Sequence, residues 1–187
     1  MIDSSEEFAT PHPHRFACPQ PLLRKRRERR EAERAGIART PLPPVPTPAI
    51  ALASTEKDIR RCYPVLHQLR THLDEPTMLA QILRQQADGY LLAYCEIDNE
   101  VRSVAGYRYS ENLAYGKFMY VDDLVTRNDD RSKGFGKLLF DWLVAQAKAH
   151  GCAMFALDSG VHRFDAHRFY LVNRMNIVSH HFTLRLS

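Results

Sequence analysis

The sequence predicts an α/β domain with a mixed, mostly antiparallel central sheet flanked by helices. Three observations lead to this prediction. Between residues 49 and 187, apolar runs typical of strands alternate with segments of helical spacing, in the order β-α-α-β-β-β-α-β-α-β. Short turns connect strands in the first half, which favours antiparallel pairing, whereas a helix connects two strands in the second half. Hydrophobic residues make up 44% of the 187 residues, enough to bury one core of ordinary size.

Residues 1–48 differ from the rest in composition, and we expect them to form a flexible basic arm. They contain nine of the eleven prolines, five of them in the segment PLPPVPTP at 41–48. Such a segment favours extended polyproline II and cannot continue a helix or a central strand. The segment RKRRERREAER at 24–34 has the composition of a short charged helix without an apolar face to bury. The domain is therefore expected to cover residues 49–187.

The first half of the domain is defined by apolar spacing and by residues that begin or end elements. Ser54 or Thr55 would cap the first helix, in which Pro64 predicts a kink, and Gly89 would end the second helix. A hairpin-like turn is expected at Asn99 and Glu100. The elements, in order strand, helix, helix and three strands, are expected at 49–54, 56–73, 75–89, 90–98, 101–109 and 116–125.

The second half is predicted to continue as helix, strand, helix, and a final strand or hairpin. Gly151 would close its first helix, and Asp165 would cap the second. The last segment, MNIVSHHFTLRL, mixes apolar and polar residues in a way typical of a half-buried strand. These elements are expected at 137–150, 152–159, 164–173 and 175–186.

The net charge of +4 is unevenly distributed. Residues 1–48 hold nine Lys/Arg and six Asp/Glu, whereas residues 49–187 hold seventeen and sixteen and are nearly neutral. The basic run at 24–30 has no interleaved aromatic residue that would stack on bases. A solvated charged tail is therefore the first interpretation of the arm, and nucleic-acid binding is the alternative.

Targeting signals and cysteine spacing indicate the compartment. The N-terminus MIDSSEEF is acidic and lacks the apolar region of a secretory signal, and no run has the length of a membrane span. The four cysteines lie far apart without a CxxC pair, which argues against a disulfide framework or a zinc knuckle. We expect a cytoplasmic protein without a membrane partner.

The segment TRNDDRSKGFGKLLFDWL, residues 126–143, passes from a polar turn through a glycine-containing loop into a helix. Glycines let backbone N–H groups converge, and a helix N-terminus favours negative charge, so the loop predicts a phosphate site. It does not match the P-loop, which requires Ser or Thr after Gly-Lys, or the dinucleotide fingerprint, which requires a third glycine. The remaining pattern is Arg131-x-x-Gly134-x-Gly136.

This pattern follows the strand sequence YVDDLV by a few residues, and a downstream A-x-x-x-Y runs from Ala166 to Tyr170. Together, in the order strand, loop, helix, strand and helix, the two motifs resemble the GNAT N-acetyltransferase superfamily in its bacterial, single-domain form. The resemblance covers residues 50–187. The chain departs from the family pattern at Arg163, where Asn is frequent, and at Arg174-Met175, where Gly-Phe is frequent. These differences concern the shape of the acceptor site.

The resemblance implies the acyl-CoA N-acyltransferase fold, with acetyl-CoA as co-substrate and no metal ion. It places the CoA pyrophosphate against backbone N–H groups of the glycine loop, with added charge from Arg131 and Lys133. Those N–H groups belong to Ser132, Lys133, Gly134, Phe135, Gly136 and Lys137. Backbone groups of Leu124 and Val125 would pair with the pantetheine arm, and the N–H near Leu124 would polarise the acetyl carbonyl. Tyr170 would donate a proton to the departing thiolate.

Asp122 and Asp123 are the candidates for the base, because an amine acceptor enters as an ammonium with a pKa of about 10. Both end the strand beside the expected thioester. Strand alternation places Tyr120, Asp122 and Leu124 on one face, and Val121, Asp123 and Val125 on the other. The resemblance favours Asp122, since family members with an acidic pair here use the first acid through a water molecule. The alternative is that both acids only anchor neighbouring loops.

Two other patterns have simpler explanations. Tyr170 has helical spacing with Ala166 and Phe169, so it also fits a buried aromatic stripe without any catalytic role. His162 and His167 are five residues apart, which is not the spacing of a helical ligand pair. The adjacent His180 and His181 would point to opposite faces of a strand, so we expect no metal site.

We therefore expect an N-acetyltransferase that moves the acetyl group of acetyl-CoA to a primary amine of a small molecule or protein, by direct attack in a ternary complex. The main alternative is a catalytically idle CoA-binding or protein-interaction module of the same fold. A second alternative is a nucleic-acid adaptor that acts through its arm. The sequence does not select among polyamines, aminoglycosides, amino acids, peptide N-termini and lysines as acceptors, and it leaves a homodimer open.

Overall fold

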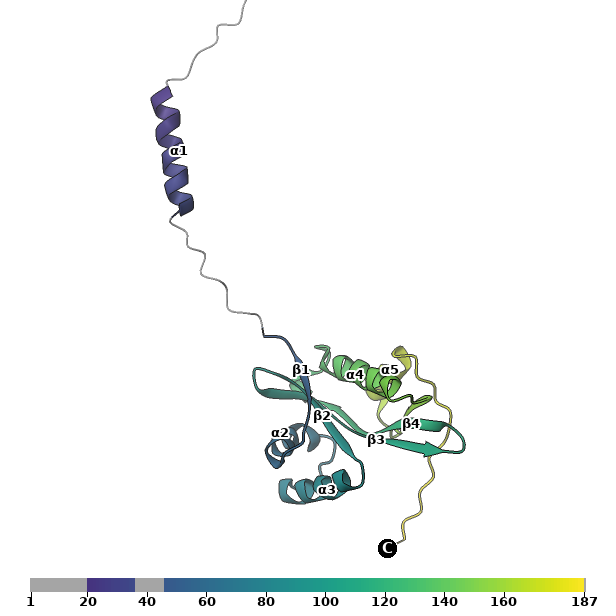
Figure 1. The fold of residues 1–187 in the computed structure, drawn as a ribbon. Helices are drawn as coiled ribbons and strands as arrows, with labels where there is room; N and C mark the ends of the chain where they lie inside the picture. The colour runs from purple at the N-terminus through teal and green to yellow at the C-terminus, as the bar shows by residue number, and fades with distance from the viewer. Residues whose placement is uncertain (1–19, 36–45, 187) are drawn as a thin grey trace, which may run out of the picture. The chain divides into compact units, whose positions relative to one another are not determined.

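The computed structural model describes residues 20–35 and 46–186, which belong to two separate units (Figure 1). The first unit contains helix α1 (Gln20–Ala35), which includes the charged segment 24–34. Ion pairs one helical turn apart support it, at 3.1 Å between Arg24 and Glu28 and at 3.0 Å between Arg27 and Glu31. Cys18 and most of the Pro-rich segment lie outside the described residues.

The second unit is built on a five-stranded sheet in the order β1-β2-β3-β4-β5. The first four strands pair antiparallel in succession, and β5 pairs parallel with β4. The predicted mixed, mostly antiparallel sheet is therefore confirmed. The strands are β1 (Ala49–Leu52), β2 (Leu91–Ile97), β3 (Glu100–Asn112), β4 (Gly116–Thr126) and β5 (Met154–Leu157).

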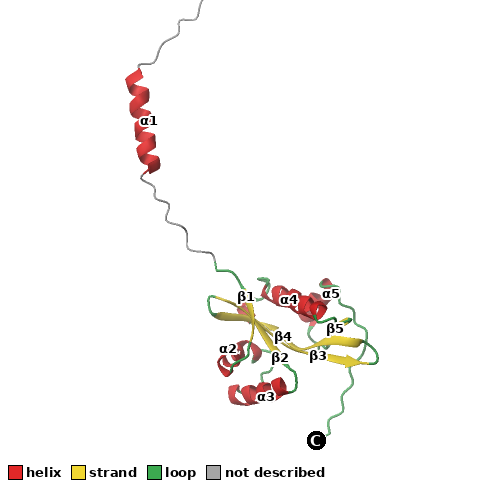
Figure 2. Cartoon of the chain, viewed as in Figure 1, coloured by secondary structure: helices red, strands yellow, loops and turns green. Residues whose placement is uncertain are grey.

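Helices cover both faces of the sheet (Figure 2). On one face, α2 (Glu56–Leu66) and α3 (Glu75–Ala87) bury Ile59 and Ile82 against strand residues such as Val104. On the other face, α4 (Phe135–Ala149) buries Leu139 and Leu143 against Met119. A 3-10 turn, η1 (Asn128–Asp130), precedes α4, and α5 (Phe164–Val172) packs on α4 through Phe169 and Phe140, with ring centroids 5.5 Å apart.

The predicted helix signals have mixed outcomes. The Thr55 hydroxyl accepts from the Asp58 N–H at 3.2 Å, and Gly89 and Gly151 have φ of 86° and 70°, as expected of residues that begin and end helices. However, α2 ends at Leu66 rather than at residue 73. It ends two residues after Pro64, the residue at which the sequence predicted a kink.

The first hairpin turn lies one residue earlier than predicted. Asp98 and Asn99 both have positive φ, 55° and 61°, and Ile97 pairs with Glu100 across the turn. Two consecutive left-handed residues are typical of a type I′ turn, which suits the twist of a two-residue hairpin. The turn is therefore Asp98-Asn99, and Glu100 already belongs to β3.

A β-bulge interrupts β4 at Asp122. Gly106 of β3 pairs with Asp123 and Tyr107 pairs with Val121, so Asp122 has no partner on β3. An extra residue reverses the alternation of side chains beyond it. Val121 accordingly packs in the core under α4, whereas Val125 packs in the core under α2 and α3. The prediction that Val121 and Val125 share a face is therefore wrong.

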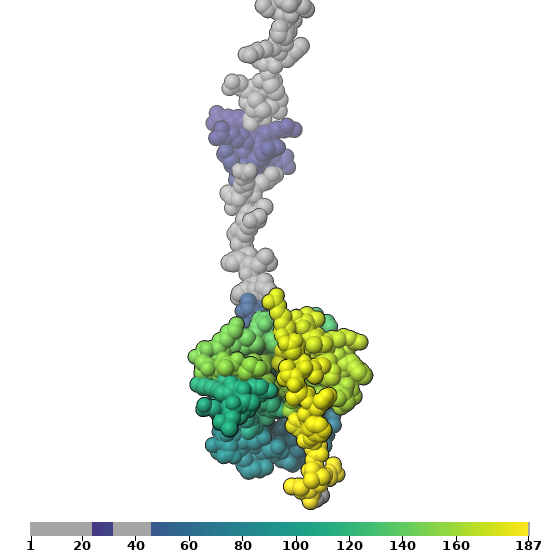
Figure 3. All heavy atoms as spheres, turned by 90° about the vertical axis from the view of Figure 1, so that its right-hand side faces the viewer, coloured from purple at the N-terminus to yellow at the C-terminus, as the bar shows by residue number. Residues whose placement is uncertain are grey.

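The C-terminal segment also differs from the prediction. Residues 175–186 form no strand within the described chain, and they run across the surface of the domain (Figure 3). Phe182, Leu184 and Leu186 are 82–90% exposed. A strand forms only when another strand pairs with it, and the apolar pattern does not specify that partner. The predicted cap of α5 is wrong as well, because Asp165 lies inside the first turn and pairs with Arg168 at 2.8 Å.

Candidate active site

The candidate site lies where β4 and β5 separate. The two strands pair only from Phe118–Met154 to Val121–Leu157. Beyond Val121, no described strand pairs with this edge of β4, although its other edge stays paired with β3 as far as Thr126. The backbone of Leu124 and Val125 is therefore open on one side, at the edge where the family resemblance implies a pantetheine arm. An open strand edge is a template for an extended ligand.

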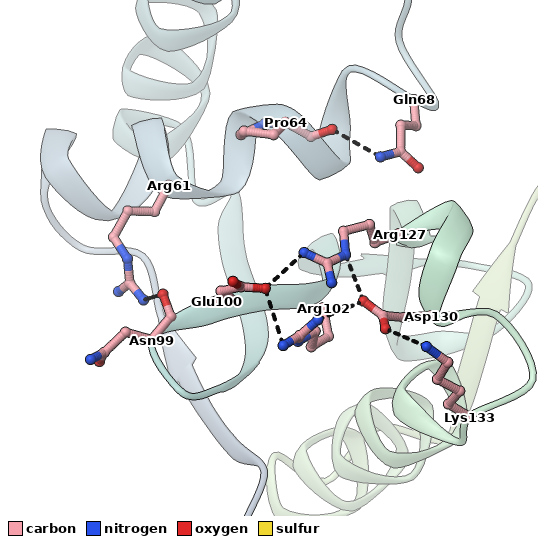
Figure 4. Close-up of polar contacts among 9 residues, drawn as sticks. All are labelled: Arg61, Pro64, Gln68, Asn99, Glu100, Arg102, Arg127, Asp130 and Lys133. Carbon is pink, nitrogen blue, oxygen red and sulfur yellow. Dashed lines mark hydrogen bonds and ion pairs between the residues drawn. The ribbon is translucent and has the colours of Figure 1, made fainter.

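A network of charged residues fixes the loop that follows β4 (Figure 4). The Asp130 carboxylate accepts hydrogen bonds from Arg127, Lys133 and Arg102, at 2.6, 3.1 and 3.2 Å. Glu100 accepts from Arg127 and Arg102 at 3.0 and 3.1 Å. Burial raises the pKa of Asp130, but the hydrogen bonds outweigh burial and hold this pKa below its usual range. A buried carboxylate with three cationic donors makes the loop a rigid platform.

The loop leads into α4 with its backbone N–H groups exposed. Gly134, the residue before the helix, has φ of 92°, and Ser132 has φ of 62°. A Cβ on Gly136 would lie 2.7 Å from the Thr126 hydroxyl, so only glycine fits there without movement. Within the described chain, the following residues donate their N–H to no acceptor: Ser132, Gly134, Phe135, Gly136 and Lys137. These groups suit an anion. The Lys133 N–H, which was also predicted for this site, instead donates to the Asp130 carbonyl at 3.3 Å.

The basic side chains of the loop are partly engaged elsewhere. Lys133 donates to Asp130, and Lys137 pairs with Asp141 one turn along α4, at 2.6 Å. Arg131 is exposed beside the open N–H groups. The backbone of the loop is therefore better placed for a phosphate than the side chains of Lys133 and Lys137.

The two acids at the end of β4 have different partners. Asp122 accepts from Arg108 at 3.0 Å, while burial raises the pKa of Asp122 and outweighs the effect of Arg108. Asp123 accepts from Arg70 at 2.7 Å and from the Tyr90 hydroxyl at 3.1 Å. The bulge turns the Asp122 carboxylate to Arg108 and the Asp123 carboxylate to Arg70. Each acid thus lies beside one guanidinium.

Two pockets meet at Asp122. The first, called here the thioester pocket, has a volume of about 120 Å³. Its lining includes Asp122, Leu124, Asp158 and Tyr170. The second, called here the acceptor pocket, has a volume of about 210 Å³ and lies against α2, α3 and the loop between them. Asp122 and Arg70 line both pockets, whereas Asp123 lines only the second.

Tyr170 lies on α5 at the wall of the thioester pocket. Its ring contacts Phe169, with centroids 5.7 Å apart. In the part of the chain that the structure describes, its hydroxyl has no hydrogen-bond partner, and burial raises its pKa although Arg163 opposes this effect. The hydroxyl is therefore protonated at neutral pH and available to a ligand.

The structure thus brings Asp122, Leu124 and Tyr170 together around one pocket. The glycine loop follows the same strand, between β4 and α4. Sequence reasoning missed Arg70, Tyr90, Arg108 and the Asp130 network. Arg70 and Asp123 are 53 residues apart. No local motif marks such a contact, because an arginine or an aspartate on its own is a common surface residue and does not indicate a distant partner.

Comparisons with known proteins identify the family and support the fold. The uncharacterized N-acetyltransferase YhdJ of Bacillus subtilis (strain 168) is 33% identical over 118 residues, which are 63% of this chain and 83% of that protein. The aminoglycoside N-acetyltransferase AAC(6')-Iy, solved in complex with CoA, superimposes with a TM-score of 0.69 and 13% identity, over 77% of this chain and 97% of that chain.

A ribosomal-protein-alanine N-acetyltransferase from Brucella melitensis biovar Abortus 2308 superimposes with a TM-score of 0.65 and 18% identity, over 75% of this chain and all of that chain. At such identities these structures support the fold. The sequence profile of the acetyltransferase (GNAT) family matches residues 52–173, which is more than half of the chain and includes both the glycine loop and Tyr170. The protein therefore belongs to the acetyltransferase (GNAT) family.

Proposed function

We propose that this protein transfers the acetyl group of acetyl-CoA to a primary amine by direct attack in a ternary complex. The observation that carries the proposal is the convergence of Asp122, Leu124 and Tyr170 on one pocket. This pocket lies at the open edge of β4, and the glycine loop follows the same strand.

The residues present fit CoA. The five free N–H groups of the glycine loop would bind the pyrophosphate, with Arg131 adding charge at the surface. The open edge at Leu124 and Val125 would pair with the amides of the pantetheine arm. Bound acetyl-CoA supplies a thioester carbonyl, and a backbone N–H near Leu124 would stabilise the charge that develops on its oxygen.

The acid and base roles follow from the surroundings of each group. The amine nitrogen forms a bond to the acetyl carbon, and the bond from that carbon to sulfur breaks. Asp122 would take the proton that the amine loses, directly or through a water molecule, because it lines both pockets. Tyr170 would protonate the leaving thiolate, since its hydroxyl keeps its proton at neutral pH. Asp123, held by Arg70 and Tyr90, would position the acceptor.

One observation favours the alternative of an idle CoA-binding module. Asp122 is ion-paired with Arg108, and an arginine partner weakens a carboxylate as a base. Burial acts in the opposite direction and raises the pKa of Asp122 above its usual range. We favour the enzyme because the net shift makes this carboxylate a better base than an ordinary Asp.

The test is thiol release from acetyl-CoA with a panel of primary amines that includes polyamines, aminoglycosides, amino acids and N-terminal peptides. The proposal predicts release that depends on one class of amine. Calorimetry that detects CoA binding, with no release for any amine, would support the idle module.

We also propose a cytoplasmic location. In the described chain Cys62, Cys95 and Cys152 are free, which fits a reducing compartment. None of the described helices has the length and apolar character of a membrane span.

A further inference from the structure

Arg70 lies between the two pockets and touches both acids of β4. It follows α2 and lines the thioester pocket as well as the acceptor pocket. Its Nε donates to the Asp123 carboxylate at 2.7 Å, and its Nη2 donates to the Asp122 carbonyl at 3.1 Å. Its side chain is 44% exposed, so a ligand in the acceptor pocket can reach the guanidinium.

The charges of the acceptor pocket are already balanced. The two carboxylates that line it are those of Asp122 and Asp123. Arg108 pairs with the first at 3.0 Å and Arg70 with the second at 2.7 Å. An acceptor that brings only an ammonium group would therefore displace an arginine and leave that guanidinium without its anion. Separating a partly buried pair without replacing the lost partner is costly.

We infer that the acceptor carries a carboxylate next to its amine, as an α-amino acid does. This inference rests on the proposed function and names its substrate class. The carboxylate of the acceptor would bind Arg70, and the ammonium would bind Asp123, so the Arg70–Asp123 pair exchanges partners without losing a charge contact. Because the two side chains touch, the two charges of the ligand must also be adjacent. A bidentate carboxylate suits the planar guanidinium of an arginine.

The remaining lining sets the size and polarity of the acceptor. The volume of about 210 Å³ has room for a single amino acid. The wall is mixed: four apolar residues form one part of it, and His72, the Tyr90 side chain and two amides add polar groups to the charged residues. The apolar residues are Leu66, Leu73, Met78 and Ile82, and the amides are Gln81 and Gln85. The four apolar residues offer a contact surface for an apolar side chain of intermediate size, such as that of leucine.

Binding measured by calorimetry on the full chain, with CoA present, tests the inference without requiring turnover. Three ligands share one side chain and differ only in the carboxylate: leucine, leucine amide and 3-methylbutylamine. A charge-assisted, bidentate contact predicts that leucine binds about 10–100-fold more tightly than the other two. Equal affinity for leucine and 3-methylbutylamine would overturn the inference.

Variants identify Arg70 as the cause. Arg70→Gln should remove the preference for leucine, because leucine loses its carboxylate partner while 3-methylbutylamine no longer has to displace an arginine from Asp123 and should bind at least as tightly as to the wild type. Arg70→Lys should restore part of the preference. Arg60→Gln is the matched control, because Arg60 is similarly exposed, pairs with Glu75 at 2.8 Å and lines neither pocket. A preference that survives Arg70→Gln would overturn the assignment to Arg70.

Thiol release separates this inference from the proposed function. Release with amines that lack a carboxylate, at kcat/KM equal to that of amino acids, would keep the proposed function and reject the amino-acid class. Tighter binding of leucine without thiol release would keep the binding site for an amino acid and reject the transfer reaction. Arg70→Gln should act mainly on KM for amino acids, since the contact forms before the chemical step.

Discussion

Replacing Asp130 by alanine should destabilise the domain and weaken CoA binding together. The carboxylate is 3% exposed and accepts from Arg127, Lys133 and Arg102. Removing one partner of a buried ion pair costs about 3–5 kcal/mol in free energy of unfolding. Because Arg127 and Arg102 also contact Glu100, the expected loss is about 2–4 kcal/mol.

Urea unfolding followed by circular dichroism measures this loss, and calorimetry measures CoA affinity under conditions where the variant is folded. Asp129→Ala is the matched control, since Asp129 is the adjacent acid and is exposed. We expect at least about a tenfold loss of CoA affinity for Asp130→Ala, or about 1.4 kcal/mol, because the platform under the glycine loop is lost. Asp129→Ala should change neither quantity measurably.

The pH dependence gives an independent check. In the folded protein the pKa of Asp130 lies below its usual range, so the stabilisation is complete above the unfolded pKa of about 3.9 and is lost as the pH falls through the folded pKa. The difference between wild type and Asp130→Ala should therefore be constant from pH 7 to about 5 and shrink below about 4. A loss under about 0.5 kcal/mol at pH 7 would refute the role given to the network.

Two glycines give sharper steric predictions. Gly136→Val should lower CoA affinity at least about tenfold, because a Cβ would lie 2.7 Å from the Thr126 hydroxyl. Gln146→Ala on the same helix is the control and should leave CoA affinity unchanged. Wild-type CoA affinity of Gly136→Val, measured by calorimetry, would show that the loop does not bind the phosphate. Gly106→Ala should lower the free energy of unfolding by about 1–3 kcal/mol, because its Cβ would overlap the Tyr90 ring, 1.7 Å from the hydroxyl oxygen. A variant that unfolds at the same temperature as the wild type would contradict this contact.

The sequence was sufficient to predict those features of the fold that depend on neighbouring residues. Thr55, Gly89 and Gly151 act locally, and each begins or ends the helix that it was expected to begin or end. The glycine loop was found for the same reason, since its motif is contiguous. The sequence also predicted the mixed sheet, because short turns and one crossover helix restrict the pairing of strands.

The sequence was insufficient to predict the features that depend on contacts between residues far apart in the chain. The bulge at Asp122 is a property of the pairing with β3, and it reversed the faces expected for the residues beyond it. Arg70 meets Asp123 only after α2 packs on the sheet, and Arg102 meets Asp130 from another strand. The prediction of a final strand at 175–186 was wrong, because an apolar pattern forms a strand only where the edge of a sheet is available to pair with it.

Substituting Phe for Tyr170 tests the proposed reaction most directly. The change keeps the ring and removes only the hydroxyl, which has no partner within the described chain, so folding and acetyl-CoA affinity should be nearly unchanged. General acid catalysis contributes about 10²–10⁴-fold, and the fall should appear in kcat rather than in KM, because the proton is needed only as the bond to sulfur breaks. The measurement is steady-state thiol release by the matched pair of proteins, with an amine that the wild type acetylates. The account predicts a kcat reduced about 10²–10⁴-fold in Tyr170→Phe; an unchanged kcat, with chemistry shown to limit the rate, would contradict it.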